Sequence, residues 1–115
     1  MKRSRYVAVC GASDPDPEQR ELAREVGRRL AEAGAVVLCG GLGGVMEAAA
    51  EGASGAGGTV VGILPGADRA SGNAHLTIAI ATGLGEARNA VLANALEGVP
   101  VAISAEEAVR AALGD

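Results

Sequence analysis

The feature that most constrains the fold is a cluster of four glycines between an apolar run and an amphipathic one. The apolar run covers residues 35–38, the glycines lie within 40–44, and the amphipathic run covers 45–53. This order predicts a β-strand, a tight loop and a helix. Because glycine tolerates positive φ and has no Cβ, the loop can offer bare N–H groups at a helix N-terminus to an anion. The alternative is a turn without a ligand, and since neither G-x-G-x-x-G nor the P-loop motif is present, no nucleotide is named.

The rest of the 115-residue chain continues this alternation of strands and helices. Nearly continuous apolar runs are typical of parallel strands that are covered on both faces. Right-handed crossovers place the first three strands in the spatial order 3-2-1. We therefore expect a single domain over residues 1–115, an α/β sandwich of three layers around a mostly parallel sheet of about five strands. Strands are expected at 6–11, 35–39, 59–64, 76–82 and 100–103, and helices at 17–33, 44–51, 86–96 and after Ser104.

Short local signals mark the ends of the first two helices. Asp16 is expected to cap the first helix, with Pro17 at its first position and Gln19 completing a capping box. Gly34 is expected to end that helix. The glycine-rich stretch 52–58 is expected to form the loose end of the second helix and a turn.

Composition excludes several classes of function. The net charge is −4, Tyr6 is the only aromatic residue, and the basic residues form no stripe, so nucleic-acid binding is not expected. No apolar run approaches the length of a membrane span, and we expect a cytoplasmic protein. Cys10 and Cys39 form no C-x-x-C pair and are expected to be reduced and buried at strand ends. With His75 as the only histidine, no metal site is expected.

Open α/β sheets bind ligands beyond the carboxyl ends of their strands, and three loops are expected to converge there. They are Gly11–Asp16, Gly40–Gly44 and Thr82–Arg88. Arg88 lies in the first turn of its helix, where the macrodipole disfavours a cation, so it is a candidate anion ligand whose guanidinium points toward the glycines. The alternative is a solvated arginine paired with Glu86. No nucleophile and base can be paired, which favours a binding site over a reaction centre.

Several segments together resemble a known family. They are Val9–Ser13, Gly40–Ala48, Gly58–Gly66 and Thr82–Asn89, in this order. The chain is similar to the LOG-like Rossmann superfamily, long labelled "possible lysine decarboxylase", and within it to the molybdenum cofactor carrier-like proteins. The resemblance implies a Rossmann-like fold, a homodimer, and a small phosphate-bearing ligand such as a nucleotide or a molybdopterin-type cofactor. The implied ligand-binding residues are Gly11, Ser13, Gly40, Gly41, Gly43, Gly44, Thr82, Gly83, Gly85 and Arg88. For Ser13, a role as a turn residue is the alternative.

The resemblance also bears on catalysis. In the enzyme branch of the family, phosphoribohydrolases cleave nucleoside 5′-monophosphates with an arginine, which Arg88 matches, and a glutamate in a P-G-G-x-G-T-x-x-E segment. That segment is absent from this chain, together with the strand, loop and helix to which it belongs. The resemblance therefore implies cofactor binding without catalysis. The alternatives are a phosphoribohydrolase, in which Arg88 would be catalytic, and a ligand-free dimerisation module.

The absent unit also leads to a prediction about the sheet. In the family, the strand of that unit lies beside the first strand, so without it one edge of residues 6–10 would be unpaired. A short link after the third helix would let residues 100–103 take that place. The expected strand order is therefore 4-3-2-1-5.

Overall fold

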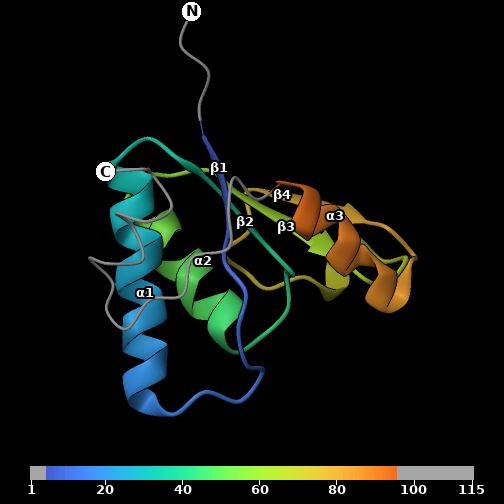
Figure 1. Ribbon diagram of the computed structural model, residues 1–115, viewed down its shortest axis with the longest axis horizontal. Coiled ribbons are helices and arrows are strands. Elements are labelled where there is room, and N and C mark those ends of the chain that lie inside the picture. The colour runs from blue at the N-terminus through green and yellow to red at the C-terminus, as the bar shows by residue number, and fades with distance from the viewer. Residues whose placement is uncertain (1–4, 96–115) are drawn as a thin grey trace, which may run out of the picture.

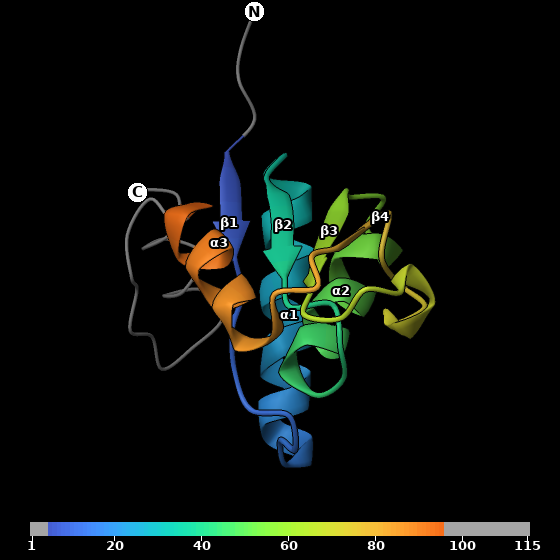
Figure 2. The same cartoon turned by 90° about the vertical axis from the view of Figure 1, so that its right-hand side faces the viewer.

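The computed structural model of the protein describes residues 5–95. These residues form three layers, with a parallel sheet in the middle and helices on both of its faces. The helices α1 and α2 cover one face of the sheet and α3 covers the other (Figures 1 and 2). Two short 3₁₀ turns, η1 and η2, flank the last strand. The elements are β1 (Tyr6–Ala8), α1 (Pro17–Glu32), β2 (Val36–Cys39), α2 (Val45–Gly55), β3 (Val60–Leu64), η1 (Arg69–Ser71), β4 (Ile78–Ala81), η2 (Gly85–Ala87) and α3 (Arg88–Ala95).

The strand order is β1-β2-β3-β4, and every neighbouring pair is parallel. This confirms the predicted order of the first four strands. Helices α1 and α2 share one face because right-handed crossovers that move in one direction across a sheet stay on one side. The predicted strand at 100–103, its pairing beside β1, and the helix after Ser104 lie outside the described residues.

Most strands are shorter than the sequence predicts. Strand β1 ends at Ala8 rather than at Gly11, although the Val9 N–H still donates to Leu38 O at 2.8 Å. The chain leaves the sheet after this bond and runs toward α1. The apolar run therefore continues beyond the ladder, which is why the hydrophobic pattern overestimates the strand.

Side chains alternate between two cores on opposite faces of the sheet. In β2, Val37 and Cys39 are fully buried under α1 and α2, whereas Leu38 packs with Leu92 of α3. Alanines of α2, such as Ala50, lie in the first core, where small side chains let the helix approach the sheet closely.

The N-terminus of α1 has the predicted capping box. The Gln19 N–H donates to Asp16 Oδ1 at 2.7 Å, the Asp16 N–H donates to Gln19 Oε1 at 3.0 Å, and Pro17 is the first helical residue. The helix ends at Glu32, and Gly34 follows with a φ of 82°. These observations confirm the predicted ends of this helix to within a residue.

We expect Asp16→Ala to lower the free energy of unfolding by about 1 kcal/mol, because one helix N–H loses its acceptor. Urea unfolding measures this loss. Asp16→Ser, which keeps a capping oxygen, should retain most of the stability. A full loss in the serine variant would show that capping is not the cause.

The prediction for the end of α2 is wrong. The stretch expected to be loose continues as helix through Gly52 to Gly55. A Cβ on Gly52 would lie 2.0 Å from Arg24 O, and one on Gly27 would lie 2.0 Å from Ala49 O. These two glycines therefore allow the backbones of α1 and α2 to touch, and Gly52 serves helix packing rather than a turn.

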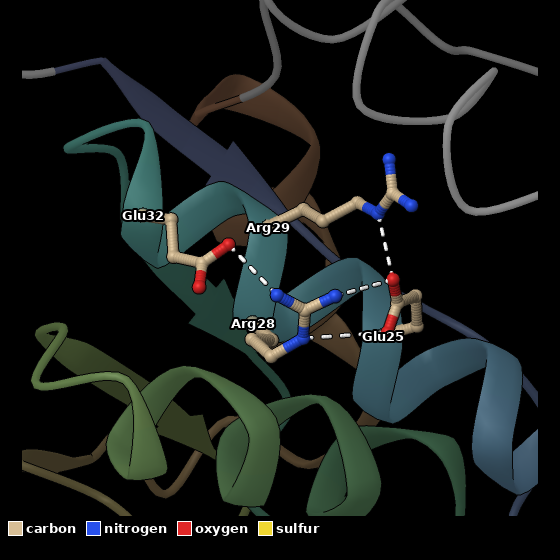
Figure 3. Close-up of polar contacts among 4 residues, drawn as sticks. All are labelled: Glu25, Arg28, Arg29 and Glu32. Atoms are coloured by element: carbon tan, nitrogen blue, oxygen red, sulfur yellow. Dashed lines mark hydrogen bonds and ion pairs between the residues drawn. The ribbon is translucent and has the colours of Figure 1, made fainter.

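Charged side chains on α1 form a small network on its outer surface (Figure 3). Glu25 accepts hydrogen bonds from Arg29 Nε at 2.7 Å and from Arg28, which also donates to Glu32 Oε1 at 2.9 Å. Hydrogen bonds from Arg29 and then Arg28 hold the pKa of the Glu25 carboxyl below its usual value. The stabilisation is present above the ordinary pKa of a glutamate and is lost as the pH falls through the lowered one. The exposure of the network keeps this contribution small.

No helix formed by residues 5–95 has the length and apolarity needed to cross a membrane.

Candidate functional site

Because all four strands are parallel, their carboxyl ends lie at one edge of the sheet, where the candidate residues gather. Here the first loop (Gly11–Asp16) packs against the glycine loop (Gly40–Gly44). The Val45 N–H, the first of α2, donates to Ala12 O at 3.0 Å, and a Cβ on Gly44 would lie 2.5 Å from the same oxygen. A Cβ on Gly11 would lie 2.7 Å from Val45 Cγ1. Both glycines therefore allow the two loops to approach each other.

Two residues of the glycine loop have a backbone conformation that favours glycine. Gly41 has a φ of 80° and Gly44 a φ of 74°. A Cβ on Gly41 would also meet Leu64 Cδ2 at 2.4 Å. Gly43 differs, because its φ is not positive and a Cβ built on it would have no atom within 4 Å. The expectation that the loop needs glycine at position 43 for a positive φ is therefore wrong. The structure leaves space for a side chain at this position.

Part of the glycine loop backbone makes no hydrogen bond with the described part of the chain. The N–H groups of Leu42, Gly43 and Gly44 donate to no group of residues 5–95, and Gly43 is exposed whereas Gly44 is buried. The Val45 N–H is already used by Ala12 O. An anion at this loop would therefore be bound by N–H groups that come before Val45, the first residue of α2, and not by the N–H of Val45 itself.

Asn73 holds the glycine loop from the other side, and the sequence analysis missed it. Its N–H donates to Gly41 O at 2.8 Å and its Nδ2 donates to Leu42 O at 3.0 Å. Its Oδ1 accepts the His75 N–H at 3.0 Å, which closes a local turn. The segment around Asn73 looks like an ordinary polar surface loop, and the tendency of asparagine to form such turns is the one sequence signal that points to it.

Arg88 is the first residue of α3, and its guanidinium points toward the strand ends, as predicted. Nη1 donates to Gly40 O at 2.6 Å and to Ile63 O at 2.7 Å, and Nε donates to Asn89 Oδ1 at 2.7 Å. A Cβ on Gly40 would lie 2.3 Å from Met46 Sδ and 2.6 Å from Arg88 Nη1, so glycine leaves the space that these two side chains share. The alternative of a solvated arginine paired with Glu86 is wrong. Arg88 joins β2, β3 and α3, and its Nη2 has no hydrogen bond within residues 5–95.

Most polar groups of Thr82, Gly83 and Gly85 in the third loop (Thr82–Arg88) form hydrogen bonds with other groups of the protein. The Thr82 hydroxyl donates to Leu64 O at 2.7 Å and accepts the Leu84 N–H at 3.2 Å. The Gly83 N–H donates to Gly66 O and the Gly85 N–H to Pro65 O, both at 2.9 Å. Gly83 and Gly85 have φ values of 66° and 60°. These three predicted ligand residues therefore shape the loop that carries Arg88, and their donors are occupied.

Ser13 is the remaining candidate ligand residue, and the two cysteines lie after β1 and at the end of β2. Ser13 is exposed beside Gly44. Cys39 is buried as expected, whereas Cys10 is exposed, because the chain leaves the sheet before reaching it. Burial raises the pKa of the Cys39 thiol, although a hydrogen bond from the Gly41 backbone and the charge of Arg88 act in the opposite direction. The Cys39 thiol is therefore neutral near pH 7.

A metal site finds no support in the described part of the chain. Residues 5–95 contain no group of three or more His, Cys, Asp and Glu side chains placed to hold a metal ion. His75, the only histidine of the chain, lies with its Nε2 3.9 Å from Glu51 Oε2. This pair is a surface contact between α2 and the loop after β3.

The fold and the loops at the strand ends define a small Rossmann-like domain of the LOG-like superfamily. Residues 4–107 match the SLOG cluster4 family, and the chain belongs to this family. The predicted family is thereby confirmed.

Known relatives are longer than this chain. A molybdenum cofactor binding protein from Rippkaea orientalis is 37% identical with a TM-score of 0.77, over 80% of this chain and 58% of that one. The molybdenum cofactor carrier protein of Chlamydomonas reinhardtii is 38% identical with a TM-score of 0.69, over 73% and 53%. An uncharacterised protein of Archaeoglobus fulgidus is 43% identical over 93 residues, which are 81% of this chain and 61% of the relative. The chain thus spans little more than half of these relatives.

Proposed function

We propose that this chain binds a phosphate-bearing cofactor of the molybdopterin type at the glycine loop and does not act as an enzyme. The observation that carries the proposal is the set of N–H groups of Leu42, Gly43 and Gly44, which donate to no group of residues 5–95, beside the space around a Cβ built on Gly43. Similar chains in Rippkaea orientalis and Chlamydomonas reinhardtii bind or carry the molybdenum cofactor. A nucleotide is the alternative ligand, because backbone N–H groups recognise the phosphate rather than the base.

The site favours binding over reaction. Arg88 is the candidate for catalysis. Its Nη1 donates hydrogen bonds to two backbone carbonyls and its Nε donates to Asn89, so Nη2 is the nitrogen left to contact a ligand. The sequence lacks the P-G-G-x-G-T-x-x-E segment that supplies the glutamate in phosphoribohydrolases. We therefore expect no release of adenine when the protein is incubated with AMP. Release that depends on Arg88 would show that the protein is an enzyme.

The proposal includes a single domain over residues 1–115, a homodimer and a cytoplasmic location. Ile78 and Ile80 of β4 are 48% and 46% exposed on the face of the sheet that α3 covers elsewhere. A second copy of the chain would bury this surface. Both cysteines are free, as is usual in a reducing compartment. Sedimentation equilibrium would distinguish the dimer from a monomer.

Gly43→Val tests the ligand site. A side chain at position 43 meets no atom within 4 Å, so the fold should persist while the added methyl groups block the approach to the loop. We expect the variant to melt within about 2 °C of the parent protein. It should bind neither AMP nor molybdenum cofactor released from a molybdenum enzyme, as measured by isothermal titration.

The matched control is Gly55→Val, because Gly55 also has open space around it but lies at the far end of α2. This variant should bind like the parent. Equal affinity of the parent and Gly43→Val would refute binding at the glycine loop. Failure of the parent to bind either compound would leave the ligand-free dimerisation module as the better description.

A further inference from the structure

We infer that Asn73 is a positioning residue that sets the direction of the Leu42 and Gly43 N–H groups in the glycine loop. The inference rests on the proposed function for what the loop binds. It assigns a role in that site to a residue of the loop between β3 and β4, outside the three loops that the sequence analysis brought together.

The geometry of the peptide bond couples the direction of each carbonyl to that of the N–H that follows it. No peptide bond among the described residues is cis. In a planar trans peptide the C=O and the following N–H point in opposite directions. A partner that fixes the direction of a carbonyl therefore also fixes the direction of the next N–H.

Asn73 fixes two consecutive carbonyls. Its main-chain N–H donates a hydrogen bond to Gly41 O at 2.8 Å, so the Leu42 N–H points away from Asn73. Its side-chain Nδ2 donates a hydrogen bond to Leu42 O at 3.0 Å, so the Gly43 N–H also points away from Asn73. Two successive N–H groups on one side of the loop form the concave donor arrangement that binds oxyanions such as phosphate.

The side chain of Asn73 is itself held in place. Its Oδ1 accepts the His75 N–H at 3.0 Å, which orients the amide so that Nδ2 faces the glycine loop. Without these bonds the loop, with two residues at positive φ and open space at Gly43, would have more conformations available. Ligand binding would then have to supply the ordering that Asn73 supplies in advance.

Two substitutions separate positioning from charge. Asn73→Ala removes both side-chain bonds without adding charge. Asn73→Asp keeps an acceptor for the His75 N–H, removes the donor to Leu42 O, and places a carboxylate against that oxygen. The matched control is Asn94→Asp, which makes the same change in charge at an exposed position of α3.

The first measurement uses the ligand-free protein. We expect both Asn73 variants to show an altered amide chemical shift and a lower heteronuclear NOE at Gly43, because the Leu42 carbonyl before it loses its side-chain donor, with the amides of α1 unchanged. Asn94→Asp should leave the loop amides as they are. Unchanged loop amides in both Asn73 variants would overturn the positioning role, whatever the protein binds.

The second measurement is affinity for AMP by isothermal titration. Both Asn73 variants should bind about tenfold more weakly than the parent, and Asn94→Asp should bind like the parent. Weaker binding by Asn73→Asp alone would indicate repulsion by its charge and would overturn the inference. If the parent itself binds neither AMP nor molybdenum cofactor, the proposed function fails, while the amide data still decide whether Asn73 orders the loop.

Discussion

Gly52→Val is expected to lower the free energy of unfolding by about 3 kcal/mol or more, the largest effect we predict for a single substitution. A Cβ at this position would lie 2.0 Å from Arg24 O, which is a backbone atom of α1 and cannot rotate away. Helices α1 and α2 would have to separate, and the core beneath them, including Leu30 and Ala53, would lose its packing. Urea unfolding followed by circular dichroism measures the change.

Gly27→Ala should act in the same direction, because a Cβ there would lie 2.0 Å from Ala49 O on the opposite helix. The control is Gly55→Ala, which adds a methyl group to the same helix at a position with open space. It should be neutral or slightly stabilising, since alanine favours the helix more than glycine does. If Gly52→Val unfolds at the same urea concentration as Gly55→Ala, the backbones of α1 and α2 are not in contact.

Arg88→Ala is expected to have the second largest effect, on stability as well as on binding. The substitution leaves Gly40 O and Ile63 O without their charged donor, which should cost about 3 kcal/mol of unfolding free energy. Binding of a phosphate ligand should weaken by roughly 1.5–3 kcal/mol, the range for a hydrogen bond to a charged group. Thermal unfolding and isothermal titration with AMP measure the two effects separately.

Arg69→Ala is the control, because Arg69 is an exposed arginine in the turn η1. It should change neither quantity appreciably. A second test uses Gly40→Ala, whose Cβ would lie 2.6 Å from Arg88 Nη1. If the arginine occupies that space, Gly40→Ala should cost less in the Arg88→Ala background than in the parent. Purely additive effects would show that Arg88 does not occupy the space beside the Gly40 Cα.

The sequence predicted the elements and their order well where a local signal decides the structure. The capping box at Asp16 depends on residues within one turn, so it forms as the pattern predicts. The order of β1 to β4 follows from the alternation of strands and helices and the handedness of the crossovers. The position of Arg88 at the start of α3 was also visible, and its orientation toward the strand ends followed from the unfavourable macrodipole.

Glycines were the main source of error, because one residue type serves different purposes that the sequence does not distinguish. Gly41 and Gly44 have positive φ, as a tight loop requires, whereas Gly52 lies inside a helix and allows another backbone to approach. A glycine in a turn and a glycine at a helix crossing look the same along the chain. The difference depends on which atoms of a distant segment lie opposite the missing Cβ.

The sequence by itself determined the family and the parallel sheet, and it predicts that the glycine loop binds an anion. Contacts between the ligand-site candidates and any ligand stay predictions. Only the tertiary structure decided how the loop is held, because its supports come from distant parts of the chain. Asn73 reaches Leu42 across 31 positions, and Arg88 reaches Gly40 across 48. Such hydrogen bonds depend on how the elements pack, so they cannot be predicted from the pattern of residues that are neighbours in the sequence.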